Sequence, residues 1–446
     1  MAISKITTRG MSGDTLEAGD IAANAIGASE LANNAVDTAA IADDAVTGAK
    51  IENNPTVAGN LTVAGTSTLT GNTTISGTST LTGNATASGN LTVAGDIVPS
   101  SPLSHRNLLV NGSMQVWQRG SAYSGLTSGY FAPDHWAFYL QGGGTGRVQI
   151  ENMSLADLNT TGHRTAMKCL PAVIDSSLGT NDYWFMRTHI EGQDLQQLQY
   201  GTANAKTITL SFWCKSNITS ANAFAIRFDK GDNTRYGCVK TFGLSAANTW
   251  EKKVITVTPT EGSTTFITNS GGAIDNDNGS GMYINFNLRG GTDNHGTADI
   301  WTTSTSTWGT SASTNFMSST NNNFYLTGVQ LELGSNATPF EHRSYGEELR
   351  RCQRYYYVND SIDMALYYAN TAGGGSPTEN FTHPVEMRAA PTITATRQSN
   401  DGNATSLGIR NITTSNYNQY LGGAANAQLA AGHNANPMTN THSAEL

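Results

Sequence analysis

Residues 207–213 read TITLSFW, in which Ile208, Leu210 and Phe212 alternate with hydroxyl side chains. Successive side chains of a β-strand point to opposite faces, so the three apolar side chains share one face. The stretch therefore predicts a strand whose one face lies in a core.

Further stretches carry strand signals at short intervals along the chain. In YINFNLR, residues 283–289, the side chains of Ile284, Phe286 and Leu288 alternate with polar ones. The other signals are GRVQIENM at 146–153, AFAIRFDK at 223–230, WEKKVITVTPT at 250–260 and NFYLTGVQLELG at 323–334. Alternating strands separated by loops rich in Gly, Asn, Ser and Thr indicate an antiparallel β-sandwich.

The polar character of the chain comes from small side chains rather than from charge. Charged residues make up 13% of the 446, and 47 Gly stand against 11 Pro. The net charge of −9 lacks the basic surplus that neutralises phosphates, so we expect no nucleic-acid partner. The four cysteines match no zinc spacing and form no disulfide framework, so we interpret them as buried thiols; they are Cys169, Cys214, Cys238 and Cys352.

The chain carries no recognisable targeting segment. Its first residues, MAISKITTRGMSGDT, lack the apolar core of a signal peptide. No apolar run approaches the about 18 residues of a membrane-spanning helix. We therefore expect synthesis in a cytoplasm, without a signal peptide and without membrane insertion.

The first 103 residues differ physically from the rest of the chain. They hold three basic and nine acidic side chains and no aromatic one, since Trp117 is the first aromatic residue. Within residues 16–54 an aliphatic side chain recurs every five residues, in decads such as IADDAVTGAK at 41–50. Neither a helix nor a flat strand places every fifth side chain on one face, so each unit requires a bend.

A six-residue repeat follows in residues 55–98. Its glycines are Gly59, Gly65, Gly71, Gly77, Gly83, Gly89 and Gly95, and its main apolar positions are Val57, Val63, Leu69, Ile75, Leu81, Ala87 and Val93. Seven units make little more than two coils of a single-chain left-handed β-helix, whereas three chains wound together would share three aliphatic side chains per layer. We expect a homotrimeric β-shaft; the alternative is a disordered Ser/Thr/Gly linker.

Aromatic residues in polar loops are the candidate contacts for a carbohydrate, because sugars present C–H surfaces to flat rings. Trp301 and Trp308 lie in DIWTTSTSTWGTSAST, residues 299–314, where no other large apolar side chain follows Ile300. We therefore interpret both as exposed platforms. Further candidates are Tyr183 and Trp184 in TNDYWFMR, and Tyr417 and Tyr420 near the C-terminus; we interpret the other tryptophans, Trp117, Trp136, Trp213 and Trp250, as packing residues.

One loop has the composition of a cation site. The sequence AIDNDNGSG, residues 273–281, places Asp275 and Asp277 around a glycine turn. An EF-hand beginning at Asp275 would need a Glu where the sequence has Phe286, so this is no EF-hand. The alternatives are a Ca²⁺ ion on Asp275 and Asp277 or a solvated Asx turn without any cofactor.

Three segments together resemble phage tail-fibre and receptor-binding proteins. They are NLLVNGSMQVWQRG at 107–120, SFWCKSN at 211–217 and YLTGVQLELGSNATPFEHRSYGEELRRCQRYY at 325–356. The decads, and FTHPVEMRAAPT at 381–392, are also similar to segments of such fibres. The resemblance implies a jelly-roll domain like that of carbohydrate-binding modules, in a mainly β homotrimeric fibre.

The resemblance also implies an organisation and a role. The N-terminus of such a fibre would dock on tail proteins of the virion. The C-terminal part of the fibre would bind a host-surface receptor such as a glycan. The expected segments are an attachment segment 1–15, decads 16–54, a Gly-hexad trimeric shaft 55–98, a jelly-roll sandwich 104–343, a helical joint 344–358 and a C-terminal tip β-domain 359–446.

The joint is the one segment that reads as a helix. In SYGEELRRCQRYY, the side chains of Tyr345, Leu349, Cys352 and Tyr356 follow helical spacing on one face. Glu347 stands four residues before an arginine, which is a favourable helical pair.

An enzyme is the alternative to a pure binding protein, because some tail proteins cleave polysaccharides. A glycosidase needs two carboxylates about 5–9.5 Å apart. The candidates show no pairing signal; they are Asp134, Glu151, Asp157, Asp182, Glu191, Asp229 and Asp232. No hydrolase or nucleotide-binding motif occurs, so we expect no catalysis; the alternative is a tail-associated polysaccharide depolymerase.

Overall fold

The computed structural model describes residues 57, 60–70, 72–82, 85–89, 104–362, 364–368, 378–396, 404–423, 427–431 and 438–445. The chain divides into two units, Met1–Thr92 and Val93–Leu446. The predicted attachment segment 1–15 and the decads 16–54 lie outside the described residues.

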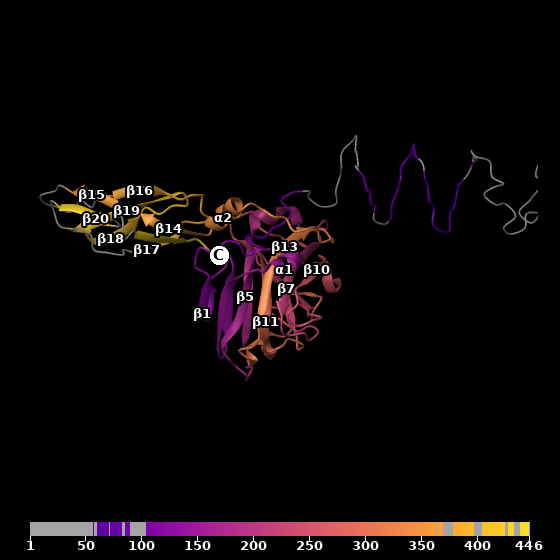
Figure 1. Ribbon diagram of the computed structural model, residues 1–446, viewed down its shortest axis with the longest axis horizontal. Coiled ribbons are helices and arrows are strands. Elements are labelled where there is room, and N and C mark those ends of the chain that lie inside the picture. Colours follow the sequence, from indigo (N-terminus) through magenta and orange to yellow (C-terminus); the bar gives the residue numbers. More distant parts are fainter. Residues whose placement is uncertain are drawn as a thin grey trace, which may run out of the picture. The chain divides into compact units, whose positions relative to one another are not determined.

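The described hexads form a regularly bending trace without helix or strand (Figure 1). Their aliphatic side chains are exposed, from 50% at Val63 to 74% at Leu61. A Cβ added at Gly65 or Gly77 would meet no atom of the same chain. Within one chain, therefore, nothing covers the apolar positions of these hexads.

Two antiparallel sheets form the sandwich of the second unit (Figure 1). The six-stranded sheet has the order β1 (Ala122–Leu126), β4 (Thr145–Asn152), β5 (Thr165–Val173), β13 (Phe324–Leu333), β7 (Ile208–Ser216), β10 (Glu251–Val257). The seven-stranded sheet has the order β12 (Trp301–Thr302), β9 (Tyr236–Phe242), β8 (Phe224–Lys230), β11 (Ser280–Gly290), β6 (Tyr183–Glu191), β3 (Ala137–Gln141), β2 (Ser128–Tyr130). The six predicted strand stretches correspond to β4, β7, β8, β10, β11 and β13, so the antiparallel sandwich is confirmed.

The core lies between the two sheets and uses the alternation that the sequence predicts. Leu210 and Phe212 of β7 and Ile284 and Phe286 of β11 are at most 1% exposed. The rings of Phe212 and Phe286 meet across the interface, with centroids 5.2 Å apart at 88°. This edge-to-face contact joins the two sheets directly. All four cysteines are buried and free, as predicted.

In the described part of the chain, helix α1 and several 3₁₀ turns connect the strands of the sandwich. Helix α1 covers Leu155–Thr161, and the 3₁₀ helix η2 covers Gly192–Leu198. The shorter 3₁₀ turns are Glu261–Ser263, Ser270–Gly272, Thr292–Asn294 and Phe316–Ser318. Among the described residues no helix is long and apolar enough to cross a membrane.

Helix α2 spans Tyr345–Gln353 and is shorter than the predicted joint 344–358. Ser344 caps its N-terminus by accepting a hydrogen bond from the Glu347 backbone N–H. The chain then enters a strand at Tyr356, so the prediction that Tyr356 lies on the helix face is wrong. Tyr345 is 57% exposed, whereas Cys352 on the same predicted face is buried.

Short strands make up the C-terminal part of the second unit. One sheet has the order β14 (Tyr356–Ile362), β21 (Met438–Ser443), β17 (Thr392–Thr396). A second pairs β15 (Met364–Tyr368) with β20 (Ala427–Ala431), and a third has the order β16 (Thr378–Thr382), β19 (Asn416–Gly423), β18 (Ala404–Arg410). The last strand thus pairs with the first one after α2.

Candidate functional site

The outward side of the seven-stranded sheet combines aromatic rings with an arginine. On β6, Trp184 and Met186 belong to the core, so Phe185 and Arg187 point to the opposite side of the sheet. The strand register places Tyr139 of β3 beside Phe185, and their rings stack 5.1 Å apart. We call this side of β3, β6 and β11 the outer face.

Arg187 lies at the centre of the outer face. Its guanidinium is 4.4 Å from the ring centroid of Tyr283, 4.8 Å from that of Tyr139 and 5.2 Å from that of Phe185. Its Nε donates a hydrogen bond of 2.7 Å to Oδ1 of Asn285 on β11. Cation–π attraction and this hydrogen bond hold the side chain in one place.

The loop that contains Trp308 is attached to the outer face. The Trp308 ring stacks on Phe185 at 4.4 Å and 24°. Arg227 of β8 donates hydrogen bonds of 2.7 Å to the backbone oxygens of Ser304 and Thr307. The Trp308 side chain is therefore a wall of the face rather than a free platform.

A hollow of about 370 Å³ opens beside Arg187; its lining residues are Arg187, Gly231, Asp232, Arg235, Ser280 and Tyr283. Tyr283 and Arg187 are half-buried, so both present part of their surface to solvent. The Arg235 guanidinium is bound to Asp229, which fixes the opposite wall. A tyrosine ring and charged groups around one hollow suit a polar ligand with an apolar face.

The structure contradicts the predicted exposure of three tryptophans. Trp301 is 0% exposed, and its indole Nε1 donates to the backbone oxygen of Thr258 at 2.8 Å. Trp308 is 8% exposed, and Trp184 is 0% exposed. The loop of Trp301 and Trp308 looks polar in sequence, but these rings meet residues from distant parts of the chain, as the Trp184 ring of β6 does with Phe316 at 5.3 Å.

The predicted tyrosines fall into two groups. Tyr183 and Tyr420 are half-buried, and their role as contacts stays a prediction. Tyr417 and Tyr420 both lie on β19, so the predicted place of each in a polar loop is wrong. Tyr417 is 1% exposed and stacks on Phe381 at 5.4 Å. Tyr420 lies 5.2 Å from the Arg410 guanidinium, in the C-terminal sheets and away from the outer face.

Sequence reasoning missed Tyr139, Arg187 and Tyr283. One signal was available, because alternation along YWFMR puts Tyr183, Phe185 and Arg187 on one side and Trp184 on the other. No local pattern could show that β3 and β11 flank β6 in the sheet.

The structure does not support a Ca²⁺ site on Asp275 and Asp277. Both carboxylates are exposed, and Asp277 accepts a hydrogen bond from the Gly279 backbone N–H in an Asx turn. The Lys230 ammonium occupies the interior of this loop region. Its Nζ donates to the backbone oxygens of Gly271 at 2.9 Å and Ala273 at 3.0 Å, and also to that of Asp232.

Among the described residues, potential metal-ligand atoms converge at His135, His189 and Glu445. The three lie within 4.8 Å of one another, and His135 Nδ1 is 3.9 Å from Oε2 of Glu445. Burial lowers the pKa of His135 to about 4. Arg119 donates to the other oxygen of Glu445 at 2.7 Å, so a guanidinium already occupies one side of this carboxyl group.

Three of the carboxylates considered for catalysis have structural partners. Asp182, Glu191 and Asp229 each accept hydrogen bonds from arginine side chains. These contacts hold the carboxylates in ion pairs, which is the role of structural groups.

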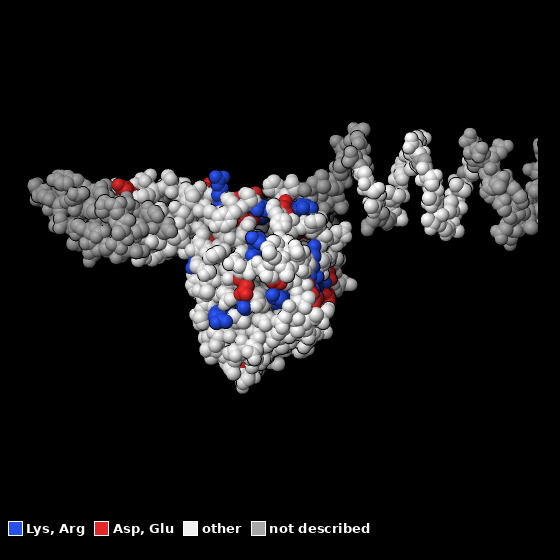
Figure 2. Space-filling model, viewed as in Figure 1, with Lys and Arg blue, Asp and Glu red and all other residues white. Residues whose placement is uncertain are grey.

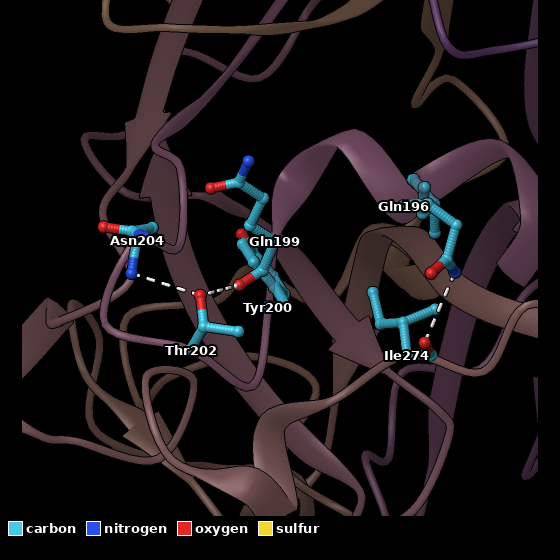
Figure 3. Close-up of a pocket in the computed structure, with 7 residues that line it drawn as sticks. Gln196, Gln199, Tyr200, Thr202, Asn204 and Ile274 are labelled. Carbon is cyan, nitrogen blue, oxygen red and sulfur yellow. Dashed lines mark hydrogen bonds between the residues drawn. The ribbon is translucent and has the colours of Figure 1, made fainter.

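A second hollow, of about 320 Å³, lies at η2 (Figure 3). Leu195 and Ile274 supply apolar surface, and Gln196 donates to the backbone oxygen of Ile274 at 3.3 Å. Thr202 likewise donates to the backbone oxygen of Gln199 at 2.8 Å. Because these polar groups bond to one another, the hollow offers a ligand less than the outer face does.

A third hollow contains the most exposed tryptophan. Trp117 is 39% exposed and lines about 280 Å³ with Gln115, Gln118 and Tyr345. This contradicts the interpretation of Trp117 as a packing residue. Gln118 donates to Oδ2 of Asp134 at 2.7 Å, so it is partly committed to the fold.

Charged side chains of both signs are scattered over the face of the molecule in Figure 2, with wide uncharged areas between them. This distribution agrees with the low charge content of the sequence.

Comparison with known proteins gives no family assignment. No family model matches the chain, and no curated protein matches it.

Solved structures of carbohydrate-binding and tailspike proteins show weak likeness. One is the enzymatically active domain of tailspike protein 4 of bacteriophage CBA120, at 13% identity and a TM-score of 0.23, over 51% of this chain and 21% of that chain. The chain thus spans about a fifth of that structure. The family 11 carbohydrate-binding module of Clostridium thermocellum, in complex with a mixed-linked tetrasaccharide, is similar at 14% identity and a TM-score of 0.22, over 50% of this chain and 98% of that chain. TmCBM61 with β-1,4-galactotriose has 9% identity and a TM-score of 0.24, over 51% of this chain and 99% of that chain.

Proposed function

We propose that the chain is the tail-fibre protein of a phage virion and that it binds a host-surface glycan on the outer face of its sandwich. The observation that supports a glycan ligand is the hollow lined by Tyr283 and Arg187, beside the ring of Tyr139 that stacks on Phe185. A tyrosine ring can cover the C–H side of a sugar, while the guanidinium group bonds its hydroxyls.

The fibre would be a homotrimer that attaches to tail proteins by its N-terminus. The exposed aliphatic side chains of the hexads support this proposal, because burial of each would yield about 1.5–3 kcal/mol and one chain leaves them in solvent. Three chains wound together would cover them.

Binding without cleavage is part of the proposal. The pairing of Asp182, Glu191 and Asp229 with arginines supports it. Incubation of the full chain with host polysaccharide should release no reducing ends; measurable turnover would favour the depolymerase alternative.

The glycan site is tested by Tyr283→Ala in the full chain on a glycan array. We expect at least tenfold weaker binding, which corresponds to about 1.4 kcal/mol. Tyr325→Ala is the matched control, because Tyr325 is a half-buried tyrosine of the six-stranded sheet. Equal losses in both variants, or a loss in the control alone, would refute the outer face as the site.

Light scattering tests the fibre. We expect a mass three times that of the 47.1 kDa chain. A monomer at micromolar concentration would refute the trimeric shaft and leave the glycan site to its own test.

A further inference from the structure

We infer that the outer face recognises an acidic glycan, whose anionic group binds the Arg187 guanidinium. This inference rests on the proposed function and specifies the ligand class of the same site.

Arg187 has no ionic partner within the described part of the chain. No carboxylate of these residues lies within 4.0 Å of its guanidinium. By contrast, the neighbouring Arg227 and Arg235 both bind Asp229, with Nη2 of Arg227 at 3.2 Å and Nε of Arg235 at 2.9 Å. Arg187 is thus a half-buried cation beside the hollow whose charge is not neutralised by an ion pair.

The orientation of Arg187 leaves the two terminal Nη atoms of its guanidinium, its fork, for a ligand. Nε is occupied by Asn285, at 2.7 Å, and neither Nη atom donates to another described residue. The ring centroids of Tyr283, Tyr139 and Phe185 lie 4.4–5.2 Å from the guanidinium carbon. A guanidinium held by rings and one hydrogen bond can give its two terminal N–H groups to one oxyanion in parallel.

Among the described residues that line the hollow, Arg187 is the cation that pairs with no carboxylate. Asp229 pairs with both Arg227 and Arg235, and Asp232 lies beside Lys230. A charge interaction with Arg187 in a partly buried hollow is stronger than in free solution. A neutral sugar would leave Arg187 without a counter-charge.

The chemistry fits a sugar carboxylate or a sugar sulfate or phosphate, since each offers two oxygens to the fork. The test uses a glycan array on which one galactan backbone appears in a neutral, a uronic-acid and a sulfated form. The full chain should bind at least one acidic form tenfold or more tightly than the neutral form, and added salt should weaken that preference.

Arg187→Met should bring the ratio of acidic to neutral binding close to one. Arg187→Lys keeps the charge but loses the fork, so the ratio should fall between those of Arg187→Met and the unchanged chain. Arg147→Met is the matched control, because Arg147 is an exposed arginine of β4 in the other sheet, and it should keep the full ratio. A thermal melt of each variant checks that the sandwich is folded.

The outcomes separate the two proposals. Binding of neutral and acidic forms with equal affinity, or an unchanged ratio in folded Arg187→Met, would overturn the acidic ligand and leave glycan binding in place. Absence of binding to every form would overturn the glycan site itself. Preference for the uronic-acid or for the sulfated form identifies which anion the fork receives.

Discussion

Arg354 and Glu191 form a two-pronged ion pair, with Nε–Oε1 and Nη2–Oε2 both at 2.7 Å. Glu191 ends β6 of the sandwich, and Arg354 directly follows α2. The Tyr355 hydroxyl donates to the same carboxylate at 2.7 Å. This pair joins the sandwich to the start of the C-terminal strands.

Glu191→Gln should destabilise the second unit by roughly 3 kcal/mol, because it leaves the Arg354 guanidinium without its buried counter-charge. Burial opposes ionisation of Glu191, but the hydrogen bonds from Arg354 and Tyr355 outweigh it and lower its pKa. The stability from this group is therefore present at neutral pH and lost on acidification. Urea unfolding at pH 7 measures the effect. Glu347→Gln, in the exposed Glu347–Arg351 pair, is the control and should lower the free energy of unfolding by under about 0.5 kcal/mol.

Lys230→Met should destabilise the sandwich by about 2–5 kcal/mol. The Lys230 side chain is 0% exposed, and its loss leaves the backbone oxygens of Asp232 and Gly271 without a donor, while that of Ala273 keeps the hydrogen bond from Asn233. Lys206→Met, at an exposed lysine, is the control for thermal unfolding.

Calcium should not raise the melting temperature of the unchanged protein, because the Lys230 ammonium already serves the oxygens of this loop. A rise of several degrees with millimolar Ca²⁺ and its reversal by chelator would restore the calcium interpretation of Asp275 and Asp277.

Glu445→Gln should remove one contribution to the pH dependence of the free energy of unfolding. Burial raises the pKa of Glu445 to about 7, although Arg119 opposes the shift. The folded state then holds a proton that the unfolded state releases between about pH 4.5 and 7, so this group makes stability fall as pH rises through that range. The difference in unfolding free energy between the two proteins should change from pH 5 to pH 7 and stay constant above it; a difference that is flat throughout contradicts the buried carboxyl.

His163→Gln should flatten the acid side of the stability curve. Burial, with a contribution from His342, lowers the pKa of His163 to about 4. The unfolded chain therefore binds more protons between about pH 6.5 and 4, and the native state loses stability as pH falls through this range. Thermal melts at pH 7.5, 5.5 and 4.5 measure this loss of stability. His105→Gln, at an exposed histidine, is the control and should show the same pH profile as the unchanged protein. A profile identical in His163→Gln and the unchanged protein would exclude His163 as a source of acid sensitivity.

The alternation of side chains along the strands was sufficient by itself to determine the sandwich. The period of two in 207–213 and 283–289 is a local property, and it correctly placed Phe212 and Phe286 in the core. Cys169, Cys214 and Cys238 are buried because a free thiol in an apolar strand packs as a small hydrophobic group. The six-residue period of the hexads predicted apolar side chains that one chain does not bury.

Only the tertiary structure decided which aromatic residues meet solvent. Trp301 and Trp308 stand among hydroxyl side chains in sequence, yet both rings are covered by residues far away in the chain. Tyr139, Arg187 and Tyr283 come together because β3, β6 and β11 are neighbours in one sheet, although β6 and β11 are separated by four other strands in sequence. Burial of a side chain depends on strand order and loop packing, and both are set by contacts between residues far apart in the chain. Periodicity depends on the backbone of one strand alone.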